Sequence, residues 1–435
     1  MQHQMQLNAY HRALPARLPA ALFLESTIMV KILIIADDFT GALDTGVKFA
    51  EAGAKTKVMT KWDNNFPDDP SDVLVLCVPT RHDSPLDAYR RVRKVVEIAD
   101  GRVGCIFKKT DSALRGNVGA ELAAVVEGCQ DTHNLYFIPA LPSMKRFTSG
   151  GVHYIDGVTV RDSVFGRDPF EPVTESYIPE LMKQQCSARI KSIWAEDAIK
   201  ETPHCDKRAI LVYDCESAED MKSEVATLCK NGIPPLLAGC SGLAQELAAY
   251  MGFENNIEAP KKAGTLVVVC GSVNPISSKQ MKYAEENGFS RIHLTGAQLL
   301  DDEAKFGPMA QGLVMISSAG NGLVIDTLNA KKGLLEESDE EQREELRKKI
   351  SGRAGMLIRD MCDAGLDSRL LIVGGDTLLA FANAINCHEY YPVCEVESGV
   401  VLFRVNYCGK DYEIISKSGG FGDEDLLVKI VNGVI

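Results

Sequence analysis

The sequence predicts an α/β protein of two domains, each with a mostly parallel sheet flanked by helices. Apolar runs of strand length alternate with segments of helical periodicity, which is the pattern of βαβ units. The chain has 435 residues, more than one hydrophobic core usually supports. A polar stretch with one proline and one glycine near residue 260 is typical of a linker.

We expect the chain to divide into four parts. Met29 directly precedes the first strand-like run, so we interpret it as the start of the fold and the residues before it as an extension. A short arm docked onto the fold is the alternative interpretation. The expected parts are an N-terminal extension outside the fold over 1–28, a first domain over 29–254, a linker over 255–264 and a second domain over 265–435.

Composition narrows the class of protein. The formal net charge is −13, which disfavours nucleic acid and anionic membranes as partners, although a local cluster of cations can still bind an anionic substrate. No stretch approaches the roughly 20 apolar residues of a membrane span. The 13 cysteines are scattered and form no C-x-x-C pair, as in a protein of the reducing cytoplasm.

The first domain opens with the clearest βα unit of the chain. Residues 32–35 are a continuous apolar run, as in a strand buried on both faces. A helix follows from Thr40, with apolar residues on one face, and ends at Gly53. Further strands are expected at 73–78, 104–107, 135–138, 209–213 and 235–238, and helices at 85–99 and 117–129. Residues 140–178 lack periodicity and are expected to form an irregular insert, functional or a lid.

The second domain repeats the alternation. Its long charged segment, 336–364, is predicted to be a helix whose early part exposes acid–base pairs to solvent. Strands are expected at 265–270, 314–317, 323–325, 370–373 and 413–415.

Polar turns follow three strands of the first domain. Asp37 and Asp38 come directly after the first strand, and Arg81 follows the strand at 73–78. The turn after the strand at 104–107 contains three cations within eight residues, suited to a carboxylate or a phosphate. Because ligands bind at the carboxyl ends of parallel strands, we expect these turns to share one edge of the sheet. Each turn alone could equally be a helix cap or a solvated loop.

Glycine-rich turns follow three strands of the second domain. They read CGSVN at 270–274, GGDT at 374–377 and SGGFG at 418–422. Glycines at such positions let backbone amides approach a phosphate. Neither G-x-G-x-x-G nor G-x-x-x-x-G-K-[ST] occurs, so a standard dinucleotide fingerprint or P-loop is unsupported.

Taken together, the motifs resemble the four-carbon acid sugar kinase family. The resemblance runs in order from Met29 to the C-terminus. It rests on ADDFTGALD at 36–44, KKTDSALRG at 108–116, the segment PALPSMKRFTSGGVHYIDG at 139–157, GCSGLA at 239–244, CGSVNP at 270–275, GGDT at 374–377 and KSGGFG at 417–422. The last motif looks closer to the threonate kinase branch than to the oxo-tetronate branch.

The resemblance implies an ATP-dependent kinase that phosphorylates the terminal (4-) hydroxyl of D-threonate, D-erythronate or 3-oxo-tetronate, with Mg²⁺ as second cofactor. It implies that the active site lies in the cleft between the two domains. It also implies a cytoplasmic protein whose partners are the sugar acid and ATP, and a homodimer is one candidate assembly. The ligands of Mg²⁺ are left unassigned. Matching positions for the sugar acid are Asp38, Arg81, Lys108, Lys109, Thr110 and Asp111, to which the same turns add Asp37 and Arg115; those for ATP are Ser272, Gly374, Gly375, Asp376, Thr377 and Gly419.

Asp38 is the expected catalytic residue, with Asp37 as its supporting neighbour. Two alternatives stay open at this point. A sugar-acid dehydrogenase would share the sheets and the cations, but its dinucleotide fingerprint is missing. A non-catalytic sugar-acid sensor would keep the first domain's turns and would not need the glycine turns.

Overall fold

The computed structural model places the first domain on an eight-stranded parallel region of one large sheet. It describes residues 30–433 apart from 63–65, 68, 132, 169–170, 194–207, 254–259, 261–264, 302–304, 321, 329 and 331–339. Adjacent strands in this region are all parallel. Their spatial order is β2 (Thr56–Met59), β3 (Val73–Cys77), β1 (Ile32–Ala36), β4 (Cys105–Lys109), β11 (Leu236–Gly239), β5 (Leu135–Ile138), β10 (Ile210–Tyr213) and β9 (Ile190–Ile193).

Helices cover both faces of this region, as a parallel sheet requires. One face packs against α2 (Phe39–Glu51), α7 (Ala218–Leu228) and α8 (Ser241–Met251). The opposite face packs against α3 (Pro85–Ala99), α4 (Val118–Gly128) and α5 (Ile178–Lys183). The side chains of β1 alternate between the two cores, and this alternation explains its unbroken apolar sequence.

The second domain continues the same sheet. Its order is β13 (Ser290–His293), β14 (Gly322–Asp326), β12 (Leu266–Cys270), β15 (Arg369–Val373), β18 (Lys410–Lys417), β17 (Val400–Tyr407) and β16 (Glu389–Glu397), parallel as far as β18 and antiparallel beyond it. One face is covered by α9 (Pro275–Glu286) and α15 (Leu426–Val431). The other is covered by α10 (Gly296–Leu300), α11 (Gly307–Ala319), α13 (Glu340–Asp363) and α14 (Gly375–Ala384).

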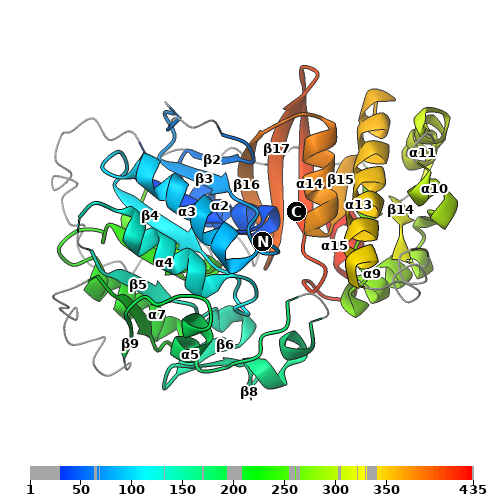
Figure 1. Ribbon diagram of the computed structural model, residues 1–435. Helices are drawn as coiled ribbons and strands as arrows, with labels where there is room; N and C mark the ends of the chain where they lie inside the picture. The colour runs from blue at the N-terminus through cyan, green and yellow to red at the C-terminus, as the bar shows by residue number, and fades with distance from the viewer. Residues whose placement is uncertain are drawn as a thin grey trace.

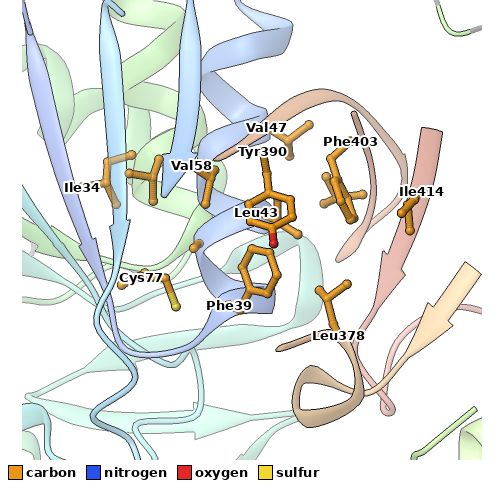
Figure 2. Close-up of a cluster of buried hydrophobic side chains, with 14 of the residues drawn as sticks. Ile34, Phe39, Leu43, Val47, Val58, Cys77, Leu378, Tyr390, Phe403 and Ile414 are labelled. Carbon is orange, nitrogen blue, oxygen red and sulfur yellow. The ribbon is translucent and has the colours of Figure 1, made fainter. Parts of the chain in front are cut away.

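Strand β16 joins the two halves into a single sheet of fifteen strands, because it also pairs antiparallel with β2. Figure 1 shows β16 and β17 standing between the blue-to-green and yellow-to-red halves. At this junction, side chains of α2, β16 and β17 pack together in one apolar cluster (Figure 2). The Tyr390 ring packs edge-on against Phe39 and Phe403, with ring centroids 4.7 and 5.7 Å apart.

The structure corrects two expectations. Residues 314–317, predicted as a strand, lie inside helix α11. The buried residues of that helix are Ala310, Leu313 and Ser317, spaced by three and four, so its buried face follows a helical period that a segment of four residues is too short to reveal.

The insert at 140–178 is also more regular than predicted. It contains a three-stranded antiparallel sheet of β6 (Arg146–Ser149), β7 (Val152–Ile155) and β8 (Val158–Thr159). Short 3₁₀ turns flank this sheet at Pro142–Met144, Val160–Asp162 and Val164–Arg167. Such short strands carry too few residues to show a period in the sequence.

Two expectations fall outside the described residues: the extension over 1–28, and the linker over 255–264 apart from Pro260. Within the part of the chain that the structure describes, no helix combines the length and the apolar character needed to cross a membrane.

Candidate functional site

The three polar turns of the first domain meet at one edge of the sheet. Strands β3, β1 and β4 are parallel neighbours, so the turns that follow them converge. Arg81, after β3, lies at the centre: its Nε donates to Asp37 Oδ2 at 2.7 Å, and its Nη2 donates to Asp38 Oδ1 at 2.9 Å. The same Nη2 is 3.7 Å from Asp111 Oδ1. The predicted juxtaposition of Asp37, Asp38, Arg81 and Asp111 is therefore present.

The two neighbouring aspartates have different surroundings. Asp38 is the N-cap of α2, where it accepts from the Gly41 amide at 3.1 Å and from the Thr40 hydroxyl at 2.6 Å. Its side chain is 22% exposed, against 4% for Asp37. Burial alone would raise the pKa of Asp37, but Arg81, Lys109 and Lys108 outweigh it, so the pKa is lowered and the carboxylate stays ionised.

One oxygen of the buried carboxylate is unused. Asp37 Oδ1 has no hydrogen-bond partner among the described residues. A buried carboxylate oxygen is costly to leave unpaired, so it is a point where a ligand hydroxyl could donate.

The two lysines that end β4 point to opposite faces. Lys108 is fully buried on the α4 side, where its Nζ lies 2.9 Å from Glu121 Oε2. The same Nζ donates to the backbone carbonyl of Lys109 at 2.7 Å. Glu121 also accepts a short hydrogen bond from the Thr80 hydroxyl. Lys109 faces α2 instead: its Nζ is 2.7 Å from the position that a Cβ on Gly41 would occupy. The structure thus places Lys109 at the start of α2, whereas the Lys108 ammonium pairs with Glu121 and acts on Asp37 only through its charge.

The pKa of Lys109 agrees with this placement. Burial lowers it, but Asp37 and Asp38 outweigh the burial and raise it above the ordinary value. The ammonium therefore remains charged at neutral pH, close to Asp37 and Asp38.

The turn after β4 is held by an ion-pair network. Asp111 accepts from Arg115 Nε at 3.0 Å and Nη2 at 2.9 Å, and from the Ala113 amide at 3.1 Å. Burial would raise the pKa of Asp111, but Arg115 and Arg81 hold it well below its usual range. Arg115 also reaches Asp168 Oδ2 at 3.3 Å. Thr110 is buried, and its hydroxyl has no partner among the described residues.

The glycine turns of the second domain form a second constellation. They follow β12, β15 and β18, which are parallel neighbours. A Cβ on Gly419 would lie 2.1 Å from Ser272 Oγ, so backbone and side chain pack too closely for a larger residue. Gly374 has a φ of 110°, in the region that favours glycine. Helix α14 begins at Gly375 with no side-chain cap, which leaves its first amides available to an anion.

The two constellations touch. A Cβ on Gly375 would lie 3.4 Å from Thr40 Oγ1, and the Thr40 hydroxyl itself donates to Asp38. Beside them, Arg347 on α13 lies 3.0 Å from His82 Nε2 and 3.4 Å from Asp376 Oδ2. The start of α2 and the start of α14 are therefore adjacent, although more than 300 residues separate them in the sequence.

Sequence reasoning missed three charged side chains near these turns. Glu121 binds Lys108, and Lys417 is buried beneath the last glycine turn, where its Nζ donates to the carbonyls of Ser418 at 3.0 Å and Gly419 at 3.3 Å. Burial lowers the pKa of Lys417 to about 8. The third is Arg146 on β6. For Glu121 and Lys417 the signal that could have found them is a charged residue inside or at the end of an otherwise apolar pattern, whereas the polar sequence around Arg146 carries no such signal.

The site contains no preformed metal centre within the described residues, because no three His, Cys, Asp or Glu side chains are grouped so as to hold an ion. Mg²⁺ in phosphate-binding sites is commonly held by substrate phosphates, waters and only one or two carboxylates. The structure therefore leaves the protein ligands of Mg²⁺ unassigned.

Comparison with known proteins matches a family model to each half of the chain. The family model for a sugar-binding N-terminal domain matches residues 32–247, and the model for a nucleotide-binding C-terminal domain matches residues 267–427. The chain is 27% identical to a D-threonate kinase of Salmonella typhimurium, covering 92% of this chain and 97% of that protein. It is 24% identical to a 3-oxo-tetronate kinase of the same organism, covering 92% and 98%.

A solved structure has the same fold. A Salmonella typhimurium protein superposes with a TM-score of 0.77 at 21% identity, covering 92% of this chain and 99% of that one. At this identity the likeness concerns the fold alone, and it agrees with the α/β architecture predicted from the sequence.

Proposed function

The chain belongs to the four-carbon acid sugar kinase family and is a phosphotransferase, and from this premise we propose that it transfers the γ-phosphoryl group of ATP to the terminal (4-) hydroxyl of D-threonate. D-Erythronate and 3-oxo-tetronate are the nearest alternatives. The observation that carries the proposal is the contact between the two constellations, in which Thr40 bonds Asp38 and lies against Gly375.

The first-domain turns supply the groups that a sugar acid needs. Asp37 Oδ1 and the Thr110 hydroxyl, both buried and without a described partner, can bind hydroxyl groups. Lys109 and Arg81 provide positive charge beside them. The donors and acceptors are held by ion pairs before any ligand arrives, which lowers the entropy cost of positioning a flexible four-carbon chain.

The glycine turns fit the phosphates of a nucleotide. The start of α14 is uncapped, the turn at Gly419 leaves no room for a side chain, and Gly374 has a φ of 110°, which a side chain would strain. When bound, ATP supplies the phosphoryl group, and Mg²⁺ neutralises charge on its phosphate oxygens. The residues that would hold the phosphates are Ser272, Gly374, Gly375, Asp376, Thr377 and Gly419.

Asp38 is the proposed general base. It is the more exposed of the two aspartates, and it lies at the helix start that meets α14. Its hydrogen bonds from Arg81 and Thr40 fix its orientation. From there it can orient the terminal hydroxyl and accept its proton as phosphoryl transfer proceeds, a contribution of roughly 10²–10⁴-fold in rate.

A coupled ADP-release assay tests the proposal. The panel contains D-threonate, L-threonate, D-erythronate, 3-oxo-tetronate and the neutral polyol D-threitol, each with ATP and Mg²⁺. We expect the highest kcat/KM with D-threonate. A higher value with D-erythronate or 3-oxo-tetronate would move the substrate assignment within the family. If no acid of the panel supports ADP release, the proposed function is refuted. A parallel assay with NAD in place of ATP controls for dehydrogenase activity.

A further inference from the structure

Arg146 is a buried cation without a carboxylate partner. It begins β6 in the insert and is only 7% exposed. Its Nη1 donates a short hydrogen bond to the Ser112 hydroxyl, and its Nε is buried with no partner among the described residues. No described carboxylate lies within ion-pair distance of its guanidinium. Buried arginines are normally paired, so an unused Nε in this place needs an explanation.

The position of Arg146 points to the site. Ser112 belongs to the turn after β4, next to Asp111. The guanidinium carbon lies 5.1 Å from the centre of the Phe165 ring and 5.9 Å from that of Phe421. Phe421 belongs to the glycine turn after β18, so Arg146 lies where the insert, the sugar-acid turns and the nucleotide turns meet. The two rings help to fix the guanidinium plane.

Three other cations of the site already have carboxylate partners, and Lys109 lies in the field of Asp37 and Asp38. Arg81 binds Asp37 and Asp38, and Arg115 binds Asp111 and Asp168. Lys108 is paired with Glu121. An acidic substrate therefore finds these charges largely neutralised, whereas Arg146 has none of its charge balanced by an ion pair.

We propose that Arg146 binds the carboxylate of the four-carbon acid through its Nε edge, and that this contact makes the enzyme prefer an acid over a neutral polyol. The inference rests on the proposed function and specifies which group reads the acid. With Nη1 held by Ser112, the edge formed by Nε and Nη2 can receive a carboxylate with two parallel hydrogen bonds. Burial lowers the pKa of Arg146, in agreement with a site that gains from an incoming negative charge.

Steady-state kinetics of Arg146→Gln, with Arg161→Gln as matched control, test this inference. Arg161 lies in the same insert, but its side chain is exposed. For Arg146→Gln we expect the KM for the acid to rise about 10–100-fold, the range for a charge-assisted hydrogen bond, with kcat within a few-fold of the wild type. The KM for ATP and the activity on D-threitol should hardly change. Arg161→Gln should behave as the wild type.

Three further measurements keep the test decisive. Arg146→Lys retains the charge but loses the fork, so an intermediate KM for the acid is expected. Isothermal titration should show that Arg146→Gln still binds ADP and has lost most of its affinity for D-threonate. Its melting temperature should fall only slightly, because no ion pair is broken and the losses are limited to the Ser112 hydrogen bond and the contacts with two rings. A fall of many degrees with unchanged KM would make Arg146 structural and overturn the inference.

The outcomes separate the two proposals. If the wild type phosphorylates an acid and Arg146→Gln lowers kcat equally for acid and polyol, Arg146 acts on the transferred phosphoryl group, and the inference fails while the proposed function stands. If the wild type neither binds nor phosphorylates any acid of the panel, the proposed function fails and this inference fails with it.

Discussion

Replacing Lys108 should cost stability, not substrate affinity. The Lys108 and Glu121 side chains are 0% and 3% exposed, and their charged atoms lie 2.9 Å apart. Lys108→Met keeps the apolar stem and leaves a buried carboxylate whose remaining described bond comes from the Thr80 hydroxyl. Removing one partner of a buried pair typically costs about 3–5 kcal/mol, so we expect the free energy of unfolding to fall by about that amount at pH 7.5.

The loss should depend on pH in a defined direction. Burial raises the pKa of Glu121 above its ordinary value of 4.5, and Lys108 and Thr80 only partly oppose this. Without Lys108 the folded-state pKa rises further. A group with a raised folded-state pKa contributes stability below its unfolded pKa and loses it as pH rises. The defect of Lys108→Met should therefore shrink from pH 7.5 to pH 5.

Urea unfolding monitored by circular dichroism measures both effects. The double variant Lys108→Met/Glu121→Gln should recover at least half of the lost stability, because the buried charge is gone. Lys109→Met is the neighbouring control: it should lower turnover while costing less stability, since Asp37 and Asp38 keep Arg81. If Lys108→Met has a stability within 1 kcal/mol of the wild type and a raised KM for the acid, the reasoning is refuted and the Lys108 ammonium belongs to the substrate site.

Three further predictions concern the catalytic turn, the nucleotide turn and a buried acid. Asp38→Asn should lower kcat about 10²–10⁴-fold with little loss of stability, because asparagine also caps helices. Asp37→Asn should reduce the melting temperature more than the rate. The reverse pattern in kinetics and thermal melts would exchange the roles of the two aspartates. Gly375→Val should raise the KM for ATP far more than that for the acid, since its Cβ position faces Thr40, and equal changes would argue against a separate nucleotide site. Burial raises the pKa of Glu224 to about 9, so this group lowers the free energy of unfolding as pH rises above 4.5. Glu224→Gln should therefore raise the free energy of unfolding by on the order of 2 kcal/mol at pH 7 and leave it unchanged at pH 4. Urea titrations that show no gain at pH 7 would contradict this.

Local pattern was enough to predict most of the elements near the site. The apolar run of β1, the capped start of α2 and the helix α3 follow from residues close together in the sequence. Helix α11 was misread because a mostly apolar segment of four residues fits a strand as well as a buried helix face. Its true period becomes visible only from the three positions that are buried.

By itself, the sequence determined that the polar turns follow parallel strands, and this was sufficient to predict that Asp38, Arg81 and Asp111 would meet. The alternation of β4 decided that Lys109 faces them and that Lys108 does not, because the two faces of the sheet are distinguished only once α2 and α4 are packed on it. Tertiary structure alone brought the start of α14 against α2 and placed Arg146 between the halves. These contacts join segments far apart in the chain, and their pairing depends on how β16 docks on β2, which no local period records.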